Sequence, residues 1–141
     1  MVNLWPGVPA KCLCDKHLNA VLAEYNDLLM PSMRKGNRID NYIRHGCVDL
    51  PVVNERIVEC LQEAKSRGHD WKYSVPSEAN KQLIHEYVVK YSGDSELDVF
   101  GEARRKEMGE MNVRVLSFRC KKCRELLVDH VISNEWMVGV P

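Results

Sequence analysis

The sequence has no excess of charge of either sign, because lysine plus arginine and aspartate plus glutamate both number 20. Any attraction to nucleic acid must therefore come from a local group of basic residues and not from the whole chain. No stretch approaches about 18 uncharged apolar residues, and residues 1–10 lack the basic region that opens a secretory signal. We therefore expect a cytoplasmic protein without membrane contact.

Aromatic residues are also scarce, at 7% of the chain. Trp5, Tyr42 and Trp71 could stack on an exposed base, but aromatic residues this sparse more often belong to a core. The 45% of apolar residues is nevertheless too high for a disordered chain, and 141 residues suit one ordinary domain. We see no internal repeat and no low-complexity segment. The sequence therefore predicts a single globular domain spanning residues 1–141.

Apolar residues recur at helical spacing in three segments. The first begins at Asp15, a plausible N-cap, and its pattern is expected to end at Pro31. The second runs from about Pro51 towards Gly68, and the third from about Ser77 to Gly93. Three such helices can share one core. Residues 1–93 are therefore predicted to form a compact helical bundle of about three main helices.

The remaining segment, residues 94–141, is predicted to be different. Residues 94–110 are charged throughout and favour at most a short helix around Glu102–Met108. The following "NVRVLSF" alternates with a period of two, "RCKKCR" is typical of a turn, and "ELLVDHVI" is a second extended run. The expected fold class is therefore mainly α, with a small C-terminal β-hairpin that carries the CxxC motif.

The six cysteines are expected to be reduced thiols or metal ligands, because disulfides are uncommon in the cytoplasm. Cys120 and Cys123 have the separation that lets two thiolates bind one tetrahedral zinc. Cys12 and Cys14, with His17 behind them, are the natural candidates for the other ligands. A structural zinc would then join the beginning of the chain to its end. Buried free thiols and a redox CxxC pair are the two alternative interpretations.

The first half of the chain also resembles a known family. The matching features are the apolar start "VNLW", the helix "DKHLNAVLAE", the basic segment ending near "YIRHG" and the helix "ERIVECLQEAKSRGHDW". In order and spacing, residues 1–73 resemble the pyrimidine-dimer DNA glycosylases with abasic-site lyase activity found in phages, chlorella viruses and bacteria. The resemblance implies a DNA-repair enzyme that needs no catalytic cofactor and acts as a monomer on damaged double-stranded DNA.

The resemblance also implies catalytic residues. Such enzymes attack the sugar C1′ with the α-amine of the mature chain and form a Schiff base. Removal of Met1 is expected because valine is a small second residue, which would make Val2 the nucleophile. An α-amine has a reference pKa of about 7.7–8.0, so part of it is unprotonated at neutral pH. Glu24 matches the position of the family's catalytic glutamate and would assist proton transfer.

The expected DNA contacts follow partly from the resemblance and partly from charge. His17 resembles the family's histidine in its helix, whereas Asn3 and Ala23 stand where the family usually carries arginine, which leaves the recognised lesion open. A basic loop supplies further candidates, and Lys121, Lys122 and Arg124 form a second possible group. The predicted DNA-binding residues are Asn3, His17, Arg34, Lys35, Arg38, Arg44 and His45.

Two other functions remain open from the sequence. The first is a non-catalytic nucleic-acid-binding or adaptor module whose working surface is a zinc-stabilised CxxC hairpin. The second is a thiol redox protein, which is the weaker candidate because the CxxC motif does not follow a βαβ pattern.

Overall fold

The structure, a computed structural model, describes residues 2–93 and 101–138, with side chains described up to residue 131. Within these ranges the chain is helical and forms no strand. The α-helices are α1 (Asp15–Glu24), α2 (Met30–Arg34), α3 (Asp40–Arg44), α4 (Val53–Ser66), α5 (Glu78–Tyr91), α6 (Glu102–Arg119) and α7 (Lys121–Val138). Short helical turns are η1 (Ala10–Cys12), the π-helical η2 (Tyr25–Leu29) and η3 (Leu50–Val52). The mainly α prediction is therefore confirmed.

The first predicted helix begins where expected but does not end at Pro31. Helix α1 passes through η2 directly into α2, and Pro31 occupies the first turn of α2. Proline has no backbone N–H to donate. The π-helical turn ends just before Pro31, where the N–H of Met30 donates to the Tyr25 carbonyl, so the hydrogen-bond pattern already changes at the place where proline cannot continue it. The helical run therefore continues to Arg34.

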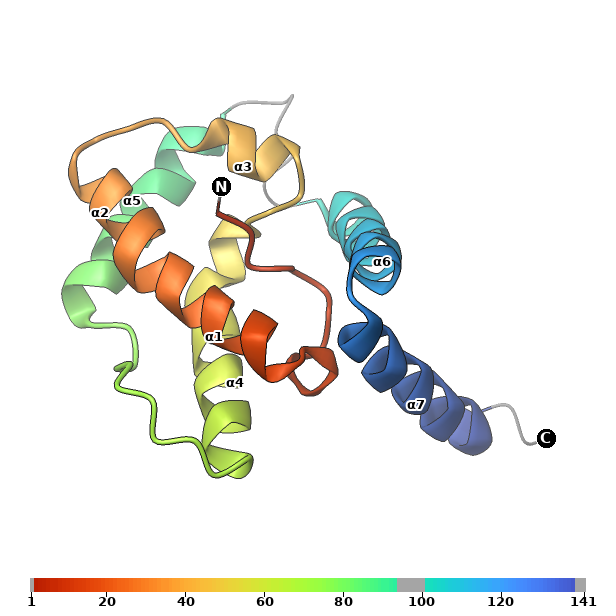
Figure 1. Cartoon of the computed structure of the whole chain (residues 1–141). Coiled ribbons are helices and arrows are strands. Elements are labelled where there is room, and N and C mark those ends of the chain that lie inside the picture. Colours follow the sequence, from red (N-terminus) through yellow and green to blue (C-terminus); the bar gives the residue numbers. More distant parts are fainter. Residues whose placement is uncertain (1, 94–100, 139–141) are drawn as a thin grey trace.

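The second and third predicted helices are α4 and α5, and they pack with α1 and α2 around one core (Figure 1). Helix α4 buries Ile57 and Cys60 completely and lies against α1. Helix α5 begins after Ser77, whose side chain accepts a hydrogen bond from the N–H of Asn80 as an N-cap. Among the described residues, no helix combines the length and the apolar character that a bilayer-spanning segment requires.

The predicted C-terminal β-hairpin is wrong, because both of its expected strands belong to helices. Helix α6 buries Met108, Asn112 and Leu116, which are spaced by four residues, and α7 buries Cys123 and Leu127 with the same spacing. The alternation in "NVRVLSF" is thus overridden by the packing of one helical face. The "RCKKCR" segment does change direction, since Cys120 is extended between the two helices. Residues 94–100 of the predicted charged segment lie outside the described residues.

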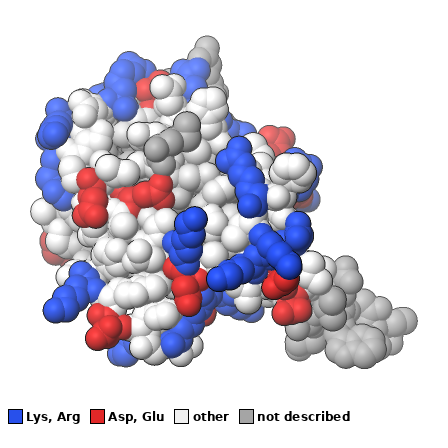
Figure 2. Space-filling model, in the orientation of Figure 1, with Lys and Arg blue, Asp and Glu red and all other residues white. Residues whose placement is uncertain are grey.

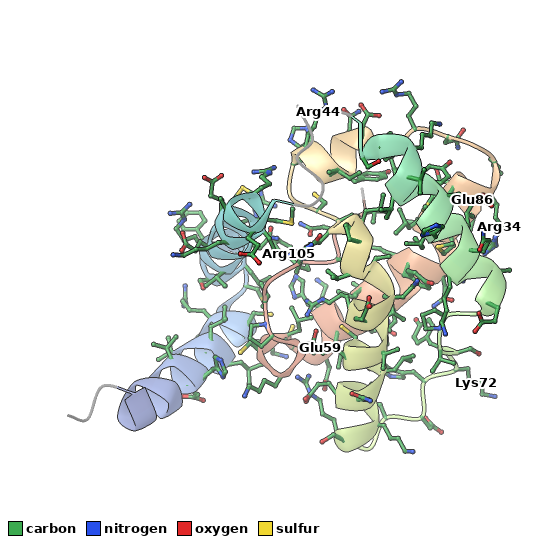
Figure 3. All side chains as sticks on the ribbon, turned by 180° about the vertical axis from the view of Figure 1, so that it is seen from behind. Arg34, Arg44, Glu59, Lys72, Glu86 and Arg105 are labelled. Atoms are coloured by element: carbon green, nitrogen blue, oxygen red, sulfur yellow. The ribbon has the colours of Figure 1, made fainter. Side chains whose placement is uncertain are left out.

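Helices α6 and α7 stand beside the bundle, and α7 runs away from it (Figure 1). Helix α7 contacts η1, whereas α6 meets residues 2–9, here called the amino-terminal strap. The buried amide of Asn112 donates to the carbonyl oxygens of Pro6 and Gly46, both at 2.9 Å. Arg105 of α6 (Figure 3) donates hydrogen bonds to both carboxylate oxygens of Asp49. The strap is therefore held between the helical bundle and α6.

The strap and α6 approach each other closely at Gly7 and Gly109. A Cβ atom on Gly7 would lie 2.4 Å from the Cα atom of Gly109, and Gly7 has a φ of +86°. Gly7→Ala is therefore expected to lower the free energy of unfolding by about 2–4 kcal/mol, combining the positive φ with a backbone clash. Chemical denaturation measures this change.

Gly68→Ala provides the matched control for Gly7. Gly68 has a φ of +83°, yet a Cβ atom there would meet nothing within 4 Å. Only the penalty for the positive φ, about 1 kcal/mol, is expected at Gly68. Equal losses of stability in the two variants would show that the strap does not press against α6.

Candidate metal centre and amino-terminal site

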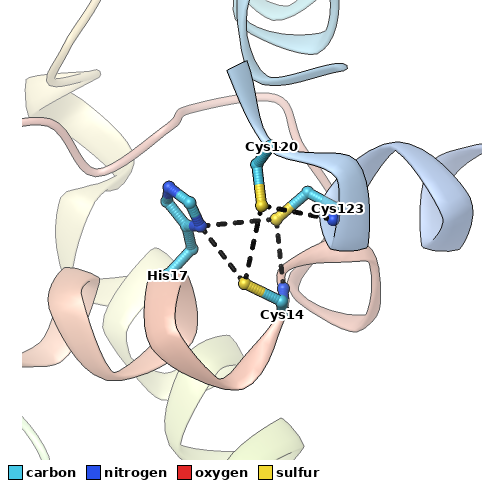
Figure 4. Close-up of side chains that lie close together, drawn as sticks. All are labelled: Cys14, His17, Cys120 and Cys123. Atoms are coloured by element: carbon cyan, nitrogen blue, oxygen red, sulfur yellow. Dashed lines mark hydrogen bonds between the residues drawn. The ribbon is translucent and has the colours of Figure 1, made fainter. Parts of the chain in front are cut away.

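Four side chains from the two ends of the described chain converge at one point: Cys14, His17, Cys120 and Cys123. Cys14 is the N-cap of α1, and His17 lies in the first turn of that helix. Cys120 occupies the break between α6 and α7, and Cys123 lies in the first turn of α7 (Figure 4). Each pair has two intervening residues, so each helix start presents two donor atoms on one side.

The distances within this group match a tetrahedral metal centre. The Sγ atoms of Cys14 and Cys120 are 3.9 Å apart, and Nδ1 of His17 lies 3.2 Å from Sγ of Cys14 and 3.5 Å from Sγ of Cys123. All four donor atoms lie within 4.8 Å of one another. Tetrahedral bonds of about 2.3 Å to sulfur and about 2.0 Å to nitrogen place two sulfurs about 3.8 Å apart and a sulfur and a nitrogen about 3.5 Å apart. The group can therefore hold a metal ion.

Backbone N–H groups also face the sulfur atoms of this group. The N–H of Cys14 donates to Sγ of Cys123 at 3.2 Å, and the N–H of Cys123 donates to Sγ of Cys120 at 3.5 Å (Figure 4). Such bonds stabilise negative charge on a thiolate, which is the form that binds metal. The two ends of the chain are thus already hydrogen-bonded across the site.

Burial sets the protonation of Cys123 and His17, whereas at Cys120 hydrogen bonds from the backbone and from the neighbouring thiols outweigh burial and lower the pKa of the thiol. Burial is the main cause that raises the pKa of Cys123 to about 12, so this thiol keeps its proton at neutral pH unless a cation replaces it. Burial, followed by the charge of Lys16, lowers the pKa of His17 and favours the neutral imidazole that a metal ligand requires. A metal ion that binds here would therefore displace protons from sulfur and not from His17.

The ligand set differs from the predicted one in one member. Cys12 was expected in it, but Cys12 lies in η1, where it is fully buried, and burial raises the pKa of its thiol. His17 takes that place. The sequence did contain the signal, since the separation of Cys14 from His17 equals that of Cys120 from Cys123. Cys47 and Cys60 are buried and free.

A second group of interest surrounds Glu24, at the far end of α1. Burial is the main influence on the Glu24 carboxyl group and raises its pKa, while the backbone of Asn3 and the positive charge of the amino terminus act in the opposite direction. The side chain of Val2, predicted as the nucleophilic residue, is only 1% exposed. The strap therefore begins against a partly buried carboxyl group.

The predicted DNA-binding residues do not gather in one place. Arg38 and Arg44 both form ion pairs with Asp40, at 3.0 and 3.7 Å. Arg34 and Arg44 lie in different parts of the bundle, on α2 and α3 (Figure 3). Lys35, next to Arg34, and His45, next to Arg44, are exposed.

The other predicted DNA contacts have partners within the protein. His17 belongs to the metal-binding group, and Oδ1 of Asn3 accepts the N–H of Trp5 at 2.8 Å. The aromatic candidates for base stacking are occupied as well. Trp5 is buried with its ring roughly perpendicular to that of His17, and Trp71 stacks on His69 with ring centroids 4.3 Å apart. Tyr42 is partly buried against the core.

Comparisons of the chain with models of protein families, with curated proteins and with solved structures found no match. Function must therefore be argued from the residues and their geometry.

Proposed function

We propose that the chain is a DNA glycosylase with abasic-site lyase activity that uses an amino-terminal α-amine as its nucleophile. The observation that carries the proposal is the partly buried position of Glu24 beside the strap: burial raises the pKa of its carboxyl group, and the backbone of Asn3 and the charge of the amino terminus act on it in the opposite direction. The raised pKa of Glu24 favours its protonated form and suits a residue that must both hold and release a proton. Cleavage between Met1 and Val2 would leave the new amine one residue from Asn3.

The chemistry requires only these two groups. The unprotonated amine of Val2 attacks C1′, the bond from C1′ to the base breaks, and the base leaves with a proton. Ring opening gives an iminium ion, whose positive charge the Glu24 carboxylate stabilises. Loss of a C2′ proton then breaks the bond from C3′ to oxygen and cuts the strand. The target nucleotide must leave the helical stack, which is easiest at a damaged or mismatched pair.

Borohydride trapping tests this proposal. Sodium borohydride should reduce the imine between the protein and an abasic oligonucleotide to a stable amine, giving a complex of one chain and one DNA strand. Peptide mapping of the complex should place the link on the α-amine of Val2, and intact mass should show that Met1 is absent. A link on a lysine, or no complex with either abasic or dimer-containing DNA, would contradict the proposal.

Glu24→Gln is the variant that accompanies the trapping experiment. It should retain binding of an abasic duplex while strand cleavage falls by at least about 100-fold, because a positioned acid or base contributes about 10²–10⁴-fold. Asp27→Asn is the matched control, since Asp27 lies one turn further on in η2 and is exposed. Unchanged cleavage by Glu24→Gln would remove Glu24 from the mechanism.

We further propose that the metal ion held by Cys14, His17, Cys120 and Cys123 is zinc and that its role is structural. Three thiolates and one imidazole are a typical structural zinc set, and the four protein donors complete a tetrahedron without an open position for water. Glu24 is seven residues, or about 10 Å along the helix, from His17. Zinc would therefore position α1 and the strap but take no part in the reaction.

The alternative function is a non-catalytic nucleic-acid-binding module. The metal-binding group favours it, because it gives α6 and α7 a fixed attachment to the bundle that does not depend on Glu24. Zinc binding together with DNA binding, but without any trapped complex, would support this alternative.

A further inference from the structure

The surface around the metal-binding group carries basic residues that the amino-terminal chemistry does not use. Five of them are adjacent to a ligand or lie between two ligands, and all five are exposed. They are Lys16, Arg119, Lys121, Lys122 and Arg124. Because the four ligand atoms lie within 4.8 Å of one another, the backbone positions of these five residues lie in one small region. We call them the metal-side basic surface.

These cations have few acidic partners. Among the described residues, no ion pair involves Lys16, Arg119, Lys121 or Lys122. Asp15 is adjacent to Cys14, but Arg67 and His69 already bind its carboxylate at 3.0 and 2.9 Å. Glu125 directly follows Arg124 in α7, and a zinc ion with three thiolates would add one negative charge. A positive excess remains, in contrast to the loop where Arg38 and Arg44 share Asp40.

The face of the molecule that carries this surface is visible in Figure 2. Lysine and arginine side chains gather there over the region where α6 ends and α7 begins, with acidic side chains at the margin. This region adjoins the start of α1, because Cys14 and His17 contact Cys120 and Cys123. The basic side chains therefore extend over both α1 and α7.

Phe118 provides an independent observation at the same place. This side chain is 89% exposed and lies two residues before Cys120, at the end of α6. A phenylalanine so exposed has no role in the core, whereas the aromatic residues predicted to stack on bases are packed within the protein. Aromatic rings beside a basic groove are typical of proteins that hold unstacked bases.

We propose that the metal-side basic surface binds the phosphate backbone of duplex DNA and that Phe118 stacks on an exposed base there. This inference rests on the proposed function for the choice of DNA. Glu24 lies about 10 Å from His17 along α1, which corresponds to about three base-pair steps of 3.4 Å. The surface would thus bind the DNA backbone close to the damaged nucleotide. The metal ion would hold α1 and α7 together and so fix the position of the basic side chains.

The salt dependence of DNA binding tests the basic part of the surface. The ligand is a duplex with a tetrahydrofuran abasic analogue, which cannot form an imine, and fluorescence anisotropy measures its affinity. Lys121→Gln with Lys122→Gln should reduce the slope of log affinity against log salt by about 1.8, because each phosphate contact contributes about 0.9. Relative to 1 M salt, where the two affinities are taken as equal, this difference in slope makes the affinity of the double variant about 60-fold lower than that of the wild-type chain at 0.1 M salt. Metal content is measured to verify that the centre is intact.

Lys65→Gln with Lys72→Gln is the matched control. It removes the same charge from two exposed lysines on and beyond α4, and it should leave the slope unchanged. Phe118→Ala should lower affinity at least about fivefold without changing the slope, since phenylalanine carries no charge. Val89→Ala, which trims an exposed apolar residue of α5, should have no effect.

The outcomes separate this inference from the proposed function. A reduced slope without any trapped complex supports the surface and rejects the lyase. A trapped complex with equal slopes for both double variants rejects the surface and retains the lyase. Binding to vesicles that contain phosphatidylserine, or to an acidic peptide, without binding to duplex DNA also overturns the proposal.

Discussion

Cys123→Ala is expected to abolish metal binding and to lower the free energy of unfolding by about 4 kcal/mol. A bound ion stabilises the folded chain by RT ln(1 + [L]/Kd), which is about 4.1 kcal/mol when free zinc exceeds its Kd 1,000-fold. Cys123 is fully buried and contributes both a ligand and the acceptor for the Cys14 N–H. Its loss would therefore weaken the attachment of α7 to the bundle as well as the metal site.

The measurements are zinc content and thermal unfolding with and without a chelator. The wild-type chain should hold one zinc ion and lose thermal stability in the chelator, whereas Cys123→Ala should hold none and should not respond. Cys12→Ala is the matched control, because it removes an equally buried thiol that lies outside the metal-binding group. Equal metal content in the two variants, or a wild-type chain indifferent to chelator, would contradict the proposed zinc site.

The helices of the bundle were easier to predict than α6 and α7. In α4 and α5 the apolar spacing agrees with the glycine that follows each helix, and α5 also has Ser77 as its N-cap, so local pattern and tertiary packing favour the same structure. In α6 they conflict. The alternation of "NVRVLSF" indicates a strand, while the single buried face formed by Met108, Asn112 and Leu116 belongs to a helix that packs on the strap. No local pattern records that long-range contact.

The metal site shows the same division. The separation of Cys120 from Cys123 suggested a metal site, and the structure brings this pair to Cys14. Whether Cys12 or His17 is a ligand depends on which side chain the start of α1 directs towards Cys120. The number and spacing of the cysteines do not contain this information. Likewise, the partners of Arg38 and Arg44 became known only when α3 placed Asp40 between them. Charge along a sequence is therefore a weaker guide than charge left unpaired in the fold.

Arg56 is the residue whose replacement should most disturb the strap. Its side chain is buried on α4, and its guanidinium group donates to three strap carbonyls: Leu4 at 3.0 Å, Trp5 at 3.0 Å and Val8 at 2.6 Å. It also donates to Glu59 at 3.0 Å. Only a planar group with several fixed donors can serve these acceptors at once. Arg56 therefore holds the strap in a conformation that includes the positive φ of Trp5.

Arg56→Met keeps most of the buried apolar volume but removes three hydrogen bonds to strap carbonyls, of which only the Trp5 carbonyl keeps another donor, the N–H of Val8. Each lost bond in a buried setting is worth about 1 kcal/mol, so the free energy of unfolding should fall by about 3 kcal/mol. Arg56→Lys should recover only part of this loss, because a single ammonium group cannot reach all three oxygens. Chemical denaturation measures both variants, and a loss below about 1 kcal/mol in Arg56→Met would show that the strap does not depend on Arg56.

The same variants connect the strap to the proposed chemistry. If the α-amine at the beginning of the strap is the nucleophile, Arg56→Met should slow borohydride trapping even at a temperature where the variant is fully folded, because the amine is no longer held beside Glu24. Glu59 remains a suitable control position, since its carboxylate also accepts the N–H of Ala10 at 2.9 Å and Glu59→Gln retains an acceptor there. We expect slow trapping in Arg56→Met and normal trapping in Glu59→Gln. This result would show that the hydrogen bonds of Arg56 to the strap position the amine, and that its ion pair with Glu59 does not.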